Sequence, residues 1–181
     1  MSRPRIEDLP RSGLSRAAQW VDDCVCWLGR AVSWLSLAMV ILTALIVIMR
    51  YLFDLGWIWM QELVVWMHAA VFMLAAAYTL ALDEHVRVDI FYRKLSRRGR
   101  AWVDTLGVLL LLLPTCGWIL YTSFDYVGDS WRIMESSRET GGMPGLFLLK
   151  TLIVITPILL ALQGMALAVR TWLPPPAGKR T

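Results

Sequence analysis

The chain has 181 residues, of which 57% are hydrophobic and 18% charged, and its formal net charge is +4 at pH 7. Long charge-free apolar runs and their connectors use nearly all of this length, which excludes a separate soluble domain. The basic excess has an explanation at a membrane surface, so it gives no reason to expect a nucleic-acid partner.

Residues 1–30 form a polar lead, which we expect to lie in the cytoplasm. No small-residue cleavage site follows the first apolar run, so we expect the first span to remain in the mature protein. From Leu14 onward apolar residues recur three or four positions apart, whereas Arg16, Asp22 and Asp23 are interpreted as lying off this stripe. The pattern predicts an amphipathic helix that either lies on the membrane surface or extends the first span.

Four runs contain no Asp, Glu, Lys or Arg, and each is 19 or 20 residues long. A helix of that length spans about 30 Å, which is the thickness of the hydrocarbon core of a bilayer. The sequence therefore predicts an all-α membrane protein whose transmembrane domain covers residues 31–172, followed by a disordered tail at 173–181. The four transmembrane helices are expected at about 31–49, 63–82, 105–124 and 151–169.

Arg and Lys are unevenly shared between alternate segments of the chain. The polar lead, the connector at 83–104 and residues 170–181 together hold fourteen of them, whereas the connectors at 50–62 and 125–150 hold four. Basic segments stay on the cytoplasmic side of a membrane, so both termini are predicted to be cytoplasmic, with the connectors at 50–62 and 125–150 outside. We also expect the basic connector to contact anionic lipids of the inner leaflet.

The four apolar runs carry few groups that would couple ion movement or hold a cofactor. Ion-driven carriers usually place ionisable groups inside the membrane, and these runs have none. His68 and His85 are expected at opposite depths of one helix, which argues against a haem held by two histidines of this chain. Cys24, Cys26 and Cys116 fit small apolar filler better than a metal or redox site. The sequence predicts no cofactor, no metal and no autonomous carrier.

Several short motifs mark the borders of the apolar runs. Arg50-Tyr51 closes the first run, Trp59-x-x-Glu62 opens the second, and His85-Val-Arg-Val-Asp89 follows it. Further along come Leu106-Gly107, Gly142-x-Pro144, Leu149-Lys150 and Leu162-Gln-Gly164, and then Arg170. In this order and spacing the set, which lies between about Val32 and Trp172, resembles the small membrane (permease) subunit of tripartite ATP-independent periplasmic (TRAP) transporters.

The resemblance implies a bacterial inner-membrane protein that acts in transport and is not an enzyme. In such systems a large membrane subunit carries the solute and the coupling ion, and a periplasmic binding protein delivers the solute, commonly an organic acid. The small subunit pairs with the large one and serves as a scaffold and as part of the docking surface. The alternative is a small anchor or assembly subunit of another membrane complex, for example a respiratory one.

Seven border residues are candidates for subunit contact or for a structural role: Arg50, Tyr51, Trp59, Glu62, His85, Arg87 and Asp89. We expect Arg50 and Glu62 to pair with each other, to pair with the large subunit, or to anchor the span ends in water. His85, Arg87 and Asp89 are expected either to bind the partner or lipid headgroups, or to form a solvated basic loop.

Overall fold

The computed structural model describes residues 13–82 and 95–172, and the expected disordered tail lies outside them. Within these residues the chain forms helices and no strand: α1 (Gly13–Phe53), α2 (Ile58–Ala81), α4 (Arg97–Gly107), the π-helical stretch η2 (Val108–Leu112), α5 (Leu113–Arg132) and α6 (Leu146–Trp172). Four helical segments are long and apolar enough to cross a membrane, one of them made of α4, η2 and α5 together. The predicted all-α architecture with four candidate spans is confirmed.

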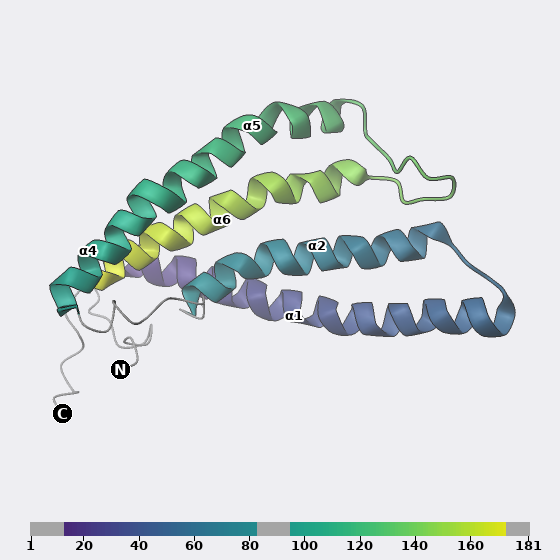
Figure 1. Cartoon of the computed structure of the whole chain (residues 1–181), viewed down its shortest axis with the longest axis horizontal. Coiled ribbons are helices and arrows are strands. Elements are labelled where there is room, and N and C mark those ends of the chain that lie inside the picture. Colours follow the sequence, from purple (N-terminus) through teal and green to yellow (C-terminus); the bar gives the residue numbers. More distant parts are fainter. Residues whose placement is uncertain (1–12, 83–94, 173–181) are drawn as a thin grey trace.

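The helical segments come together at one end of the molecule and separate toward the other (Figure 1). We call the first the terminal end, because α1 and α4 begin there and α2 and α6 end there. The second is the hairpin end, which holds the connectors 54–57 and 133–145. Helix α6 contacts α1, α2, α4 and α5, so it is the central helix of the molecule.

Helix α1 continues without a break from the amphipathic segment into the first apolar run (Figure 1). Of the two arrangements that the sequence left open, the structure therefore has the extension. The helix has 41 residues and a length of about 60 Å, twice the hydrocarbon thickness of a bilayer. One expectation for this segment is wrong: Asp22 is fully buried. It lies between buried Ala18 and Val25 at helical spacings of four and three, so it belongs to the packed stripe rather than beside it.

The third segment passes Pro114 without ending. Proline lacks an N–H group and its ring crowds the carbonyl four residues earlier, which is that of Leu110. The wider turn of η2 lies directly before the proline, and such a local adjustment lets a membrane helix continue past it. Gly164 of α6 packs against this stretch, because a Cβ there would lie only 2.3 Å from Leu112 Cδ2. The absent side chain lets the two helices approach closely.

Most of the buried apolar residues lie in the half of each segment next to the terminal end: Ala18, Val25, Val32, Ala77, Ala101, Val108, Ala166 and Leu167. Burial within the chain is 28% for the apolar window of α6 but only 6% for that of α1. The terminal end thus has the hydrophobic core, whereas most of the apolar side chains of α1 near the hairpin end are exposed. The hairpin end has few buried apolar residues, so polar contacts contribute much of what holds it together.

Candidate functional site

Glu62 links the first turn of α2 to the long connector 133–145 at the hairpin end. Its Oε2 accepts a hydrogen bond from the backbone N–H of Met143 at 2.6 Å, and its Oε1 accepts one from the hydroxyl of Ser137. Hydrogen bonds to a carboxylate are stronger than those between neutral groups. One side chain therefore ties the connector between α5 and α6 back onto α2.

The connector is shaped to receive this carboxylate. A Cβ at Gly142 would lie 2.8 Å from Glu62 Oε2 and 2.4 Å from Ser137 Oγ, so only glycine fits between them. The backbone N–H of Ser137 donates to the carbonyl of Met143 at 3.1 Å, which closes the loop on itself. Gly145 follows with φ near +95°, a conformation that glycine adopts without strain. The connector consequently has a defined conformation around Glu62.

A second acid fixes the other end of the connector. Glu135 forms an ion pair with Lys150 of α6 and accepts a hydrogen bond from the hydroxyl of Ser130 at 2.7 Å. The Lys150 ammonium also lies 4.1 Å from the centre of the Tyr126 ring, a cation–π contact. The hydrogen bonds from Lys150 and Ser130 hold the pKa of Glu135 below its usual value. Glu135 is therefore charged at neutral pH and fastens the start of the connector to α5 and α6.

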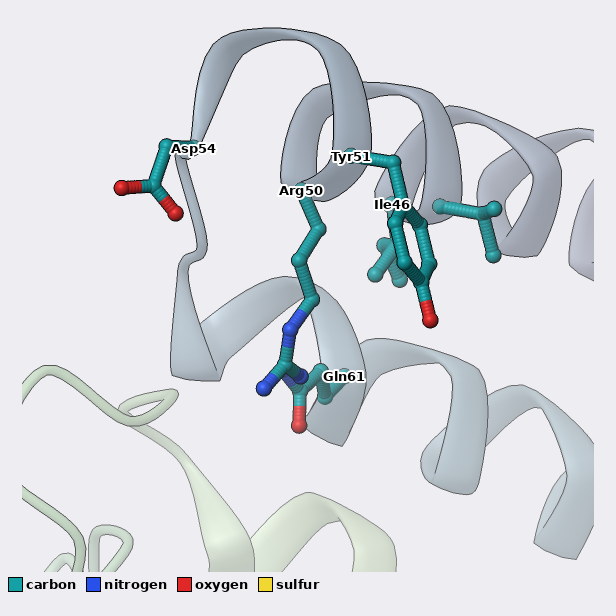
Figure 2. Close-up of a pocket in the computed structure, with 6 residues that line it drawn as sticks. Ile46, Arg50, Tyr51, Asp54 and Gln61 are labelled. Atoms are coloured by element: carbon teal, nitrogen blue, oxygen red, sulfur yellow. The ribbon is translucent and has the colours of Figure 1, made fainter.

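Arg50 and Glu62 do not pair with each other, because Glu62 is engaged by the connector and Arg50 lies elsewhere. Arg50 lines an open cleft of about 720 Å³ with Ile46, Val47, Tyr51, Asp54 and Gln61. Figure 2 shows the Arg50 guanidinium beside the Gln61 side chain, whereas Asp54 points away from them. Of the pairings predicted for Arg50, the one within the hairpin is absent.

The structure gathers four of the seven predicted site residues at the hairpin end. Glu62 is partly buried, whereas Arg50 and Trp59 are exposed and Tyr51 has an exposed fraction of 83%. The remaining three, His85, Arg87 and Asp89, lie outside the described residues. Sequence reasoning missed Ser137, Met143 and Glu135, which stand in a segment recognisable only as a loop. Residue type gave no signal of their contacts: Ser137 and the backbone of Met143 meet Glu62 of α2, whereas Glu135 meets Lys150 of α6.

A polar cluster that the sequence did not predict lies within the terminal end. Asp22 Oδ1 accepts a hydrogen bond from Gln163 Nε2 at 2.8 Å and lies 2.8 Å from a guanidinium nitrogen of Arg170. Asp22 and Gln163 are both fully buried. A buried charge needs a partner and hydrogen bonds, and here α6 supplies both to α1. The cluster thus connects α1 to α6. Among the described residues no group of three or more His, Cys, Asp or Glu is placed to hold a metal ion.

The comparison with protein families agrees with this architecture. A family model described as tripartite ATP-independent periplasmic transporters, DctQ component, matches residues 39–173. The chain belongs to the DctQ family. Neither the curated proteins nor the solved structures gave a match. The family match covers all four candidate spans in whole or in part, together with Glu62 and both ends of the long connector. It begins after Asp22, although the partners of Asp22 on α6 lie within it.

Membership of the DctQ family confirms the resemblance that the border motifs carry. The chain is a small permease component of a TRAP transporter in the inner membrane, and this family is a transporter component rather than an enzyme. The family works with a large membrane subunit and a periplasmic binding protein. The match therefore argues against the alternative hypothesis, a small anchor or assembly subunit of another membrane complex such as a respiratory one.

Proposed function

We propose that this DctQ protein is a scaffold subunit that pairs with the large membrane subunit and uses its hairpin end to help dock the periplasmic binding protein. The transported solute would be an organic acid or a similar small molecule, moved by ion-driven uptake. The observation that carries the docking role is the connector 133–145, which Glu62 and Glu135 hold at two separate points. The orientation with the hairpin end in the periplasm rests on the uneven distribution of Arg and Lys.

A connector held in one conformation suits a docking surface for physical reasons. A loop that is ordered before it meets its partner loses less conformational entropy on binding than a free one. The tethers use Ser137, Met143, Ser130 and Lys150, and they leave other side chains of the connector exposed. Arg138, Glu139 and Thr140 are among the exposed residues. These polar side chains would face an incoming protein.

Pairing with the large subunit is supported by the apolar side chains that α1 exposes toward the hairpin end. They are Leu37, Val40, Ile41, Leu45, Val47 and Ile48. Inside a membrane, helices associate through close packing, so a partner helix would cover part of this surface and lipid the rest. The predicted contact of the basic connector with anionic lipids stays a proposal, because residues 83–94 of it lie outside the described part of the chain.

The docking role is tested by removing the tether without removing the connector. In the complete transporter, reconstituted in vesicles, Glu62→Ala should raise several-fold the binding-protein concentration that gives half-maximal uptake. The reason is that the freed connector must be ordered again at each encounter. Uptake at saturating binding protein should remain close to that of the wild type.

Glu139→Ala is the matched control, because it removes the same charge from an exposed position of the same connector. It should leave the half-saturating concentration unchanged. Equal half-saturating concentrations for Glu62→Ala and the wild type would show that the tether has no part in docking. Assembly with the large subunit, measured by copurification, should be the same for all three proteins.

A further inference from the structure

The cleft beside Arg50 has no role in the contacts described so far. Within residues 13–82 and 95–172, the side chain of Arg50 makes no hydrogen bond and no ion pair. Its guanidinium projects into the cleft beside Gln61, and the ring of Tyr51, on the same helix α1, extends in the same direction (Figure 2). A guanidinium has five N–H donors in a planar fork, so an Arg without a protein partner beside a cavity is suited to an external acceptor.

The position of the cleft indicates which kind of acceptor would fit it. Arg50 is the first charged residue after the charge-free run of α1, and Gln61 lies in the first turn of α2. Both stand at the border of a span, where the headgroups of a bilayer begin. About one turn earlier in α1, within the charge-free run, Ile46 and Val47 line the same cleft with aliphatic side chains. The cleft therefore has a polar rim at headgroup level and an apolar wall that continues toward the hydrocarbon core.

We propose that this cleft binds the phosphodiester headgroup of a membrane phospholipid. The Arg50 guanidinium would donate to two phosphate oxygens, a geometry for which its fork is suited. The Gln61 amide and the Tyr51 hydroxyl supply further donors, and the start of an acyl chain would lie against Ile46 and Val47. The cleft volume of about 720 Å³ lies within the range of small-molecule sites.

The charges that line the cleft favour a phosphodiester over inorganic phosphate. Among the described residues that line the cleft, Arg50 is the only cation and Asp54 the only acid, so this lining carries no net charge. A phosphodiester carries one negative charge, which Arg50 alone can balance. Inorganic phosphate is a mixture of singly and doubly charged anions at neutral pH, and Asp54 would repel the additional charge of the doubly charged form. Both ligands share the phosphate group, and the acyl chain distinguishes them.

The proposal is tested in the complete transporter, reconstituted in vesicles that contain a photoactivatable phospholipid with its reactive group near the glycerol. After illumination, cross-linked peptides of this chain are mapped by mass spectrometry. The wild type should give cross-links within residues 46–61. Arg50→Gln should reduce them several-fold, because it removes the charge-assisted hydrogen bonds. The control is Arg132→Gln. Arg132 is an exposed residue near the hairpin end that pairs with Asp129, and its substitution should leave the cross-links unchanged.

Two further probes decide which part of the ligand is recognised. A photoactivatable diacylglycerol, which has the acyl chains without the phosphate, should label residues 46–61 only weakly. Added inorganic phosphate should not compete with the phospholipid. Equal labelling by the diacylglycerol, competition by free phosphate, or undiminished labelling of Arg50→Gln would each overturn the proposal. Absence of labelling in the wild type would also overturn it.

Discussion

Asp22 shows at the residue scale how a short-range sequence pattern can mislead. Asp22 stands next to Asp23 in a polar lead, and two adjacent acids in such a segment are expected to be solvated. Only Asp23 is exposed. Oδ1 of Asp22 contacts Gln163 and Arg170, which lie more than a hundred residues away, whereas its Oδ2 is buried without a hydrogen-bond partner among the described residues. No local periodicity contains that information, because the partners belong to another helix. The family motifs had included Gln163 and Arg170, but without a reason for their presence.

The buried cluster leads to a prediction about stability. Asp22→Ala should lower the free energy of unfolding by about 2 kcal/mol, because the Gln163 amide loses its buried acceptor and Arg170 a neighbouring charge. The measurement is thermal or denaturant-induced unfolding of the purified full-length chain in detergent. Asp23→Ala removes the same group from the adjacent exposed position and should change stability by less than about 0.5 kcal/mol. Equal effects of the two substitutions would contradict a specific role of the buried pair.

At the element scale, the close approach of α6 to η2 depends on a missing side chain. Gly164 faces Leu112 across the contact, and no atom beyond the helix itself lies within 4 Å of a Cβ built at Gly117, further along the third segment. The two glycines therefore stand in different surroundings: one is required by packing, and the other only lowers the helix propensity of its position. Sequence alone treats them alike, because both are single glycines within a span.

This difference can be measured with one pair of substitutions. Gly164→Ala should destabilise the chain by about 1–3 kcal/mol, because the added methyl overlaps Leu112. Gly117→Ala should be neutral or stabilising by up to about 1 kcal/mol, since it meets no neighbour and raises helix propensity. Adding Leu112→Ala to Gly164→Ala should restore part of the loss if the overlap is its cause. A double variant no more stable than Gly164→Ala alone would assign the loss to another contact.

The helices themselves were predictable in number and approximate position, and their ends were not. A run without charges over 19 or 20 residues has one stable form in a bilayer, so four runs gave four helices. Apolar periodicity from Leu14 predicted a helix before the first run, but it did not decide whether that helix continues into the span, as it does in α1. The hairpin-end site was predictable in the same partial way. Glu62 stood out at a span border, whereas its bonds to Ser137 and Met143 depend on how a long connector folds back.

On the scale of the whole molecule, the two ends are stabilised differently. The terminal end has the buried apolar side chains and the Asp22 cluster, whereas the hairpin end is connected through Glu62 and Glu135. The α1–α2 and α5–α6 hairpins separate toward that end (Figure 1). The molecule thus joins a packed base to an end whose shape depends on a few polar contacts.

The orientation of these ends is the last prediction. In a variant with Cys24, Cys26 and Cys116 replaced, single cysteines at Leu55 and Thr140 should react with a membrane-impermeant thiol reagent added outside spheroplasts. A cysteine at Leu95 should react only after the inner face is made accessible. All three positions are exposed, so the reagent can reach them from the correct side. The expected result follows from the excess of Arg and Lys on the segments at the terminal end. External labelling at position 95 would reverse the orientation.

The unbroken course of α1 gives the protein a mechanical property. Because one continuous helix of 41 residues forms both the first span and the segment that carries Asp22, the two parts behave as a single stiff rod of about 60 Å. A rod of that length that tilts by about 10° about one end moves its other end by about 10 Å. The contact of Asp22 with Gln163 and Arg170 of α6 lies near one end of this rod, and the short link 54–57 to α2 lies at the other. A tilt of α1 about the Asp22 contact with α6 would therefore displace the link 54–57 at the opposite face of the membrane.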